Sequence, residues 1–131
     1  MSGMQVSPVI AEATKRSGAV WVDLGDGARL VWHLWHDDAM WLVCGGLEQE
    51  LPGADHATSA VVTVRSKTSQ NDRVVTWVAD VSRVAPGAPG WDDVVPRLHG
   101  KRLNAPDGEG QPERWARDSL VLRLSPTGEE R

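Results

Sequence analysis

Arg29-Leu-Val-Trp-His-Leu-Trp-His-Asp-Asp-Ala-Met-Trp-Leu-Val-Cys-Gly-Gly46 is the densest apolar stretch of the chain. It holds three of the seven tryptophans, two of the four histidines and the single cysteine. Asp37-Asp38 interrupts it, and two strand-like runs around a short Asp-rich turn are typical of a β-hairpin. We therefore expect strands over residues 29–36 and 39–44. Because the second run is apolar on both faces, it should be central in the sheet and covered on both sides.

Length and composition indicate one domain. The chain of 131 residues is long enough to bury a core without disulfide support. A lone Cys44 excludes an intramolecular disulfide and fits a reducing cytoplasm. No apolar run approaches the roughly 18 residues of a membrane span, and no apolar segment near Met1 is typical of a signal peptide. The net charge of −4 argues against general binding to polyanions.

The rest of the chain alternates strand-like runs with turns and short helices. Helices are expected to begin at Ser7-Pro8, near Asp92 or Asp93, and at Pro112, where a cap or a first-turn proline is present. The expected strands cover residues 19–24, 29–36, 39–44, 60–67, 73–84 and 120–125. Residues 45–59 contain no Lys or Arg and are expected to form a long ordered loop. Residues 1–6 and 126–131 are expected to be loose tails.

Strands that follow one another through short turns pair in an antiparallel sheet. Closing six such strands into a small barrel removes the exposed edges of the sheet. The predicted fold class is therefore mainly β with short helices: one domain over residues 1–131, built as a six-stranded antiparallel barrel.

Five segments, taken in order, resemble the flavin-binding split β-barrel. They are Ala19-Val-Trp-Val-Asp-Leu-Gly-Asp-Gly27, Leu30-Val-Trp-His-Leu-Trp-His-Asp-Asp38, Met40-Trp-Leu-Val-Cys-Gly45, Ala60-Val-Val-Thr-Val-Arg65 and Arg73-Val-Val-Thr-Trp-Val-Ala-Asp-Val81. This fold family is the pyridoxamine-5′-phosphate-oxidase-like superfamily, which includes the deazaflavin-dependent reductases. The resemblance spans residues 7–125 and is an ordered pattern, not a single motif. Residues 101–107 with Arg114-Trp115-Ala116 are similar to a small branch of the same superfamily.

The resemblance implies a homodimeric split β-barrel with FMN or a deazaflavin in a groove between the subunits. Basic and hydroxyl side chains would hold the phosphate of the cofactor. Any redox chemistry would belong to the cofactor, while the protein supplies position and electrostatics. The function implied is a cytoplasmic flavin- or deazaflavin-binding protein that acts as a small oxidoreductase on a small molecule.

One candidate phosphate site lies on the strand over residues 60–67. Thr63, Arg65 and Lys67 alternate, so they share one face of the strand, and Ser66 lies beside them. A phosphate needs this combination of positive charge and hydroxyl donors. The alternative is a strand end that carries ordinary surface charges.

A second candidate is the basic patch Lys101-Arg102, with Arg97 and His99 nearby. These side chains could reach a phosphate across a dimer. The alternative is a solvated helix end, where cations are favoured by the helix dipole.

Trp32, Trp35 and Trp41 could stack on the ring of the cofactor, with core packing as the alternative for each, and Trp32 is the one assigned to the site. Trp32 and Trp35 are an odd number of residues apart, so a continuous strand places them on opposite faces. The same holds for His33 and His36, which therefore cannot share one metal ion. We expect no metal site, because the histidines and Cys44 have no recognised zinc spacing.

Two other function classes stay open. The first is a non-catalytic barrel that binds or sequesters a ligand, which the absence of basic residues over 45–59 favours. The second is a nucleic-acid-binding barrel that uses Arg97 to Arg102. Base binding normally needs exposed aromatic side chains beside the charge. Only Trp91 and Trp115 are near in sequence, so this class ranks last.

Overall fold

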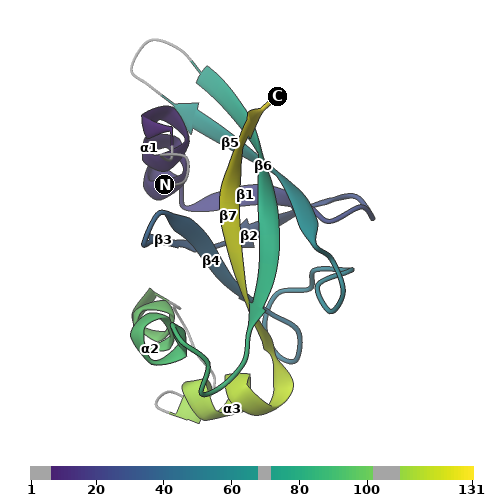
Figure 1. Ribbon diagram of the computed structural model, residues 1–131, viewed down its shortest axis with the longest axis vertical. Coiled ribbons are helices and arrows are strands. Elements are labelled where there is room, and N and C mark those ends of the chain that lie inside the picture. Colours follow the sequence, from purple (N-terminus) through teal and green to yellow (C-terminus); the bar gives the residue numbers. More distant parts are fainter. Residues whose placement is uncertain (1–6, 68–71, 102–109) are drawn as a thin grey trace, which may run out of the picture.

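The computed structural model describes residues 7–67, 72–101 and 110–131. These residues form one antiparallel sheet of seven strands and three short helices (Figure 1). In chain order the elements are α1 (Pro8–Arg16), β1 (Ala19–Asp23), β2 (Ala28–Trp32), β3 (Leu34–His36), β4 (Ala39–Cys44), β5 (Ser59–Lys67), β6 (Asp72–Val84), α2 (Trp91–Lys101), α3 (Gln111–Asp118) and β7 (Leu120–Glu130). The mainly β, antiparallel fold predicted from the sequence is confirmed.

The strand order β2-β1-β5-β6-β7-β4-β3 explains why the sheet curls. β2 and β3 are the two edges of the sheet, yet only His33 separates them in the chain. The edges must therefore lie close together, and the sheet bends into a half-open barrel. In Figure 1, α1 lies near one end of the molecule, and α2 and α3 lie near the other.

The six-strand prediction was wrong by one strand, and the reason is His33. Residues 29–36 were expected to be continuous, but β2 pairs with β1 whereas β3 pairs with β4. Between them the His33 side chain turns inward, is fully buried, and donates from Nε2 to the Thr14 carbonyl oxygen at 2.7 Å. This contact with α1 replaces strand pairing at the break.

The hairpin predicted at Asp37-Asp38 is confirmed. Both aspartates have positive φ, 55° and 54°, as a two-residue hairpin turn requires. The strand that follows, β4, is buried at all six positions, as expected for a strand covered on both sides. It is not central in the sheet, however, because it lies second from one edge.

Residues 126–131 are not a loose tail. β7 continues to Glu130, and its outer half pairs with the long strand β6, with Pro126 opposite Ala79 and Glu130 opposite Trp77. The Thr127 hydroxyl also donates to the Val78 carbonyl oxygen at 3.0 Å. β6 extends over 13 residues, so it reaches far enough to pair with both Pro126 and Glu130, with an irregularity of the register between these two pairs.

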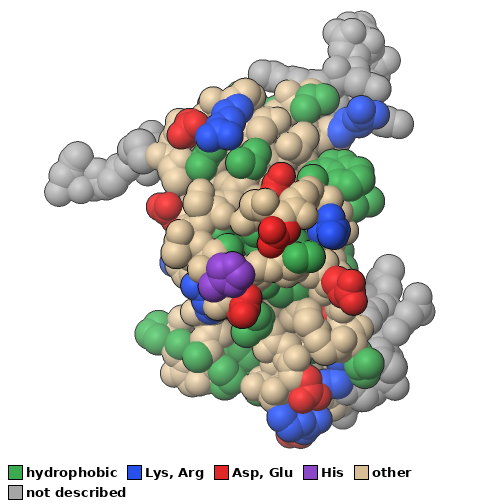
Figure 2. All heavy atoms as spheres, turned by 90° about the vertical axis from the view of Figure 1, so that its right-hand side faces the viewer, with side chains coloured by type: hydrophobic (Ala, Val, Ile, Leu, Met, Phe, Trp, Pro, Cys, Tyr) green, Lys and Arg blue, Asp and Glu red, His purple; other side chains and the backbone are tan. Residues whose placement is uncertain are grey.

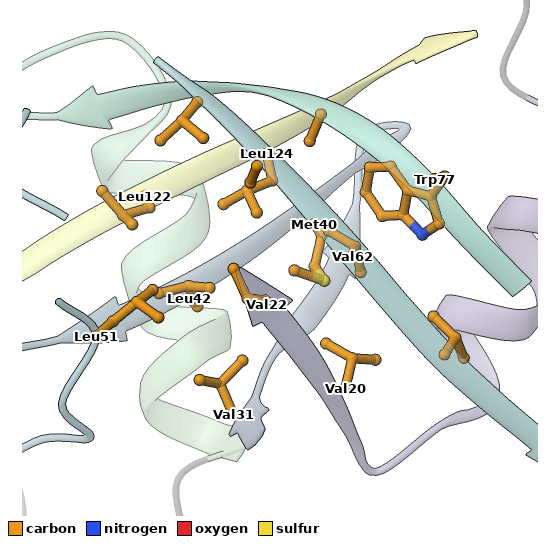
Figure 3. Packing of buried hydrophobic residues seen from close by; sticks show 14 of the residues in the cluster. Val20, Val22, Val31, Met40, Leu42, Leu51, Val62, Trp77, Leu122 and Leu124 are labelled. Atoms are coloured by element: carbon orange, nitrogen blue, oxygen red, sulfur yellow. The ribbon is translucent and has the colours of Figure 1, made fainter. Parts of the chain in front are cut away.

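The barrel core lies inside the curled sheet. Alternate residues of the strands point inward, among them Val20 and Val22 of β1 and Val62 and Val64 of β5. Figure 3 shows such side chains meeting from several strands, with the Trp77 ring at one side. Trp77 is fully buried and packs edge-on against Trp35, with ring centroids 6.3 Å apart.

A second apolar cluster, the outer cluster, lies on the opposite face of β4 and β7. Its members are Ala39, Trp41, Val43, Val94, Val95, Leu98, Trp115 and Val121, with Trp32, Leu34, Val84 and Trp91 partly buried against it. α2 and α3 supply the covering side chains. Trp32 therefore belongs to this cluster and Trp35 to the barrel core, which confirms that they face opposite sides.

The loop over residues 45–58 is ordered, as predicted. Glu48 is buried and forms an ion pair with Arg114 of α3 at 3.1 Å. Arg83 of β6 donates from Nη1 to the carbonyl oxygens of Ala54 and Ala57. Gly46 has a φ of +65°, and a Cβ there would lie 2.8 Å from the Asp118 carbonyl oxygen. Only glycine allows this close approach.

Within the described part of the chain, no helix has both the length and the hydropathy needed to span a bilayer.

Candidate functional site

The candidate site is the outward face of β2, β1, β5 and β6. Val20, Val22, Val62 and Val64 point into the barrel core, so the residues between them point outward. In register, Trp21 lies opposite both Leu30 and Thr63. Thr63 in turn lies opposite Thr76 of β6. One row of side chains thus crosses four neighbouring strands on this face.

Large apolar side chains are exposed along this face. Trp21 is 45% exposed, Leu30 56% and Val74 57%. Val74 lies opposite Arg65, two residues further along β5 than Thr63. We call Trp21, Leu30, Thr63, Arg65 and Val74 the outer patch. Apolar side chains gathered on one sheet face in this way are typical of a surface that a ligand or another chain covers.

Polar groups at the outer patch are available to a ligand. Arg65 is exposed and forms no ion pair with a described residue. The Thr63 hydroxyl is half-buried and lies 3.5 Å from the Thr76 hydroxyl. The predicted Ser66 and Lys67 belong to the same strand, but their side chains lie outside the described residues. The predicted alternation of Thr63 and Arg65 on one face is present.

Trp32 also belongs to the outward face, two residues after Leu30 and opposite Ala19. It is half-buried because it packs against the outer cluster. Both backbone groups of Trp32 bind the side chain of Gln49: the Trp32 N–H donates to Oε1 at 2.9 Å, and Nε2 donates to the Trp32 carbonyl oxygen at 3.1 Å. Trp32 is therefore held at the border of this face by Gln49 and the outer cluster, and its ring is not fully exposed for stacking.

The second basic candidate, the patch at the end of α2, is not joined to the outer patch by any contact between described residues. Lys101 ends α2, and burial lowers the pKa of its ammonium group. Its charge acts on His33, so it lies near the break between β2 and β3. No contact joins it to Arg65 among the described residues, and Arg102 lies outside them. Arg97 is bound to Asp93 at 3.3 Å, which reduces the charge that the nucleic-acid alternative requires.

Trp21 is the residue that the sequence prediction missed. It was included in a strand but was not singled out as a ligand contact. Its signal is the alternation Ala19-Val20-Trp21-Val22-Asp23, in which the valines take the core face. In a strand that alternates between the core and the surface, a large aromatic side chain at an outward-facing position is unusual. It suggests that a ligand or another chain contacts that side chain.

The buried thiol and imidazole do not belong to the outer patch. Cys44 is 1% exposed, and burial raises the pKa of its thiol to about 11, so it is a core residue as expected. Burial lowers the pKa of His33 from its ordinary 6.5 to about 4. His33 is therefore a neutral structural group at pH 7. No cluster of three or more metal-ligating side chains occurs among the residues that the structure describes.

Two concave regions lie near the loop side of the molecule. One, of about 350 Å³, is lined by Asp23, Leu24, Gly25, Ser59, Ala60 and Val61. The other, of about 340 Å³, is lined mainly by residues 50–55 with Cys44, Gly45 and Leu120. Figure 2 shows this side, where acidic and hydrophobic side chains are interspersed over the middle of the surface.

Comparison with known proteins identifies the class. No protein-family model and no curated protein sequence matches the chain. Solved structures do match. The heme storage protein HutZ from Vibrio cholerae is 12% identical, with a TM-score of 0.68 over 98% of this chain and 94% of that one. A putative pyridoxamine 5′-phosphate oxidase from Listeria innocua is 12% identical, with a TM-score of 0.59 over 94% of each chain. An F420 reductase is 14% identical, with a TM-score of 0.58 over 88% of this chain and 91% of that one.

The chain is therefore a split β-barrel protein. Its fold is that of the pyridoxamine-5′-phosphate-oxidase-like proteins, as the sequence resemblance implied. At these identities the similarity establishes the fold alone, so function has to be argued from the site.

Proposed function

We propose that the protein binds a flavin-type cofactor, FMN or a deazaflavin, on the outer patch and uses it as a small oxidoreductase. The observation that carries this proposal is the position of Trp21, a half-exposed aromatic ring beside Thr63 and two residues along the face from Arg65. The similarity to an F420 reductase and to a putative pyridoxamine 5′-phosphate oxidase supports it.

The side chains present fit such a cofactor. Arg65 would bind the phosphate, because a guanidinium group can form paired charge-assisted hydrogen bonds with phosphate oxygens. The Thr63 hydroxyl would add a donor, with Ser66 and Lys67 further along the strand. Trp21 and Leu30 would contact the ring system. When bound, the cofactor would supply the redox chemistry, and these residues would hold and orient it.

We further propose that a second copy of this chain covers the outer patch and completes the site. Trp21, Leu30 and Val74 are exposed on a single open face of the sheet. A two-fold axis near Thr63 would bring the same apolar side chains of both copies together, as an isologous dimer interface requires. We expect the dimer to be cytoplasmic.

Arg65→Ala tests the cofactor site. Removal of the guanidinium group should weaken FMN or deazaflavin binding by about tenfold or more, since a charge-assisted hydrogen bond contributes roughly 1.5–3 kcal/mol. Binding would be measured by quenching of tryptophan fluorescence, and the dimer should stay intact in sedimentation. Arg117→Ala, an exposed arginine on α3, is the matched control and should bind normally. An unchanged dissociation constant in Arg65→Ala would reject the assignment.

A protein that holds a ligand without turnover is the second candidate function. No cysteine or histidine belongs to the outer patch, so its residues offer no thiol nucleophile and no imidazole base. The similarity to a heme storage protein is consistent with this role. The two functions differ in one measurement: an oxidoreductase accelerates electron transfer from the bound, reduced cofactor to an acceptor such as menadione, whereas a storage protein slows it.

A further inference from the structure

The concave region of about 340 Å³ beside residues 50–55 borders the barrel core. Cys44, Leu51 and Ala54 line it and are members of the core cluster, and Leu120 lines it and packs against that cluster. Cys44 and Leu120 are paired where β4 ends and β7 begins. Figure 3 shows the Leu51 side chain among the other core side chains. We call this hollow, between the loop and the adjoining ends of β4 and β7, the barrel mouth.

The backbone groups around the barrel mouth already have hydrogen-bond partners within the protein. The Gly45 carbonyl oxygen accepts from the Ser119 hydroxyl at 2.9 Å. The Leu51 carbonyl oxygen accepts the Ala54 N–H at 3.2 Å, and the Ala54 carbonyl oxygen accepts from Nη1 of Arg83 at 3.0 Å. A ligand with many polar groups would lose its hydrogen bonds to water here without replacing them, so the site favours an apolar ligand.

The rim of the barrel mouth carries negative charge. Glu50 and Asp55 are its charged lining residues, and both are exposed. Residues 45–59 contain no Lys or Arg, and Arg83, which reaches this loop, is bound to the carbonyl oxygens of Ala54 and Ala57. A carboxylate or a phosphate would therefore be repelled at the rim, whereas an uncharged head group would not.

The size and lining of the barrel mouth indicate the shape of the ligand. An apolar cavity of about 150 Å³ binds benzene, and the barrel mouth is larger at about 340 Å³. Such a volume suits a chain of roughly six to eight carbon atoms and falls in the range of small-ligand sites. The described lining residues include no aromatic side chain, so no ring is offered for stacking. A flexible alkyl chain fits this aliphatic surface better than a flat ring.

We propose that the barrel mouth is a second ligand site, which binds a medium-chain alkyl group with an uncharged head, such as a fatty alcohol. The chain would lie against Leu51, Ala54 and Leu120, and the head would lie between the exposed acids and the solvent. This site is independent of the proposed function, because none of its residues belongs to the outer patch.

The test is an NMR titration of ¹⁵N-labelled protein at pH 7 with 1-butanol, 1-hexanol, 1-octanol and octanoate. The alcohols should shift the amide signals of Cys44, Gly53 and Ala54. Affinity should rise by about threefold for each added methylene, because full burial of a methylene gives about fourfold and the barrel mouth is open on one side. Octanoate should bind about fivefold more weakly than 1-octanol, since repulsion by exposed charges is modest.

A charge variant tests the role of the rim. In Glu50→Gln/Asp55→Asn, octanoate should bind within about twofold of 1-octanol, because the repulsion is gone. Both positions are exposed, so the fold should be unaffected. Asp92→Asn/Glu113→Gln removes two exposed acids from α2 and α3 and is the matched control. It should keep the discrimination against octanoate.

A blocking variant tests the location. Leu120→Trp places a larger side chain at a half-buried position of the lining and should abolish alcohol binding. Its melting temperature shows whether it is folded, and the charge variant remains a test if it is not.

Equal affinity for 1-butanol and 1-octanol, or unchanged discrimination in Glu50→Gln/Asp55→Asn, would overturn the proposal. So would shifts at the Trp21 indole and the Val74 amide without shifts at Cys44 and Ala54, because the alcohols would then bind the outer patch. The same samples are titrated with FMN. Alcohol binding without FMN binding would refute the cofactor and leave the barrel mouth standing, whereas the reverse result would refute the barrel mouth alone.

Discussion

At the scale of single residues, His33 decides where the barrel is split. It lies in the stretch with the strongest strand pattern, yet it interrupts that strand because its ring turns inward and binds α1 at the Thr14 carbonyl oxygen. This bond fixes the proton on Nε2, and Nδ1 has no hydrogen-bond partner among the described residues. An imidazole held in this way is stable only when neutral, since protonation would bury a charge.

The stability of the protein should therefore fall as the solution becomes acidic. The pKa of His33 is 6.5 ordinarily and about 4 in the folded chain, so the unfolded state takes up a proton first. This contribution to stability is complete above pH 6.5 and is lost as the pH falls to about 4. From the size of the shift, it is worth roughly 3 kcal/mol.

Urea unfolding at pH 7 and at pH 4 would measure this effect. His33→Gln should be less stable than the wild type at pH 7 but should lose less between the two pH values. His56→Gln is the control, because that imidazole is 76% exposed. A wild type and a His33→Gln variant with the same pH dependence would contradict the role of His33.

At the scale of elements, Gln49 joins strands that do not pair with each other. Its side-chain amide binds both backbone groups of Trp32 in β2, and Nε2 also donates to the Val43 carbonyl oxygen in β4 at 3.0 Å. The single side-chain amide of Gln49 thus connects β2 and β4 beside the break between β2 and β3. The loop that carries Gln49 is itself fixed by the adjacent Glu48, which binds Arg114.

Gln49→Leu should lower the free energy of unfolding by about 3 kcal/mol, because three hydrogen bonds of about 1 kcal/mol each are lost. The Trp32 amide proton should also exchange faster with solvent. Urea unfolding and hydrogen exchange measure these two effects. Glu50→Leu, the exposed neighbour, should change stability by no more than about 0.5 kcal/mol. Equal stability of Gln49→Leu and the wild type would show that the bridge is dispensable.

At the scale of the whole molecule, the sheet has two different outward faces. α2 and α3 cover β4 and β7, and the side chains beneath them form the outer cluster. Over β2, β1, β5 and β6 no described helix plays this part, and Trp21, Leu30 and Val74 remain exposed. This asymmetry is the physical basis for the proposed dimer.

The double variant Leu30→Lys/Val74→Lys should be a monomer in sedimentation while the wild type is a dimer. Both positions are more than half exposed, so lysine costs little in the folded monomer, whereas burial of two charges in each half of the interface is costly. The melting temperature of the variant, measured at low concentration, should be close to that of the wild-type monomer. Leu47→Lys is the matched control, because Leu47 is 65% exposed outside the patch. A dimeric double variant would exclude this face as the interface.

Local patterns in the sequence determined most of the elements and two of the five residues of the outer patch, Thr63 and Arg65. Runs of apolar and β-branched residues are a local property, so they revealed β1, β4, β5 and β6, and the alternation within β5 placed Thr63 and Arg65 on one face. The Asp37-Asp38 turn and the prolines at the helix starts are equally local signals. The resemblance of five segments to the flavin-binding split β-barrel predicted the split barrel, and the similarity to solved structures confirms this fold.

Only the tertiary structure decided the break at His33, the extension of β7 to Glu130 and the exposure of Trp21. Each depends on a partner far along the chain: Thr14 for His33, Trp77 for Glu130, and Leu30 and Thr63 for Trp21. A periodic pattern shows which residues share a face but not what covers that face. For this reason the pattern over residues 29–46 predicted the hairpin correctly. The break at His33 and the outer patch are seen only in the curled sheet.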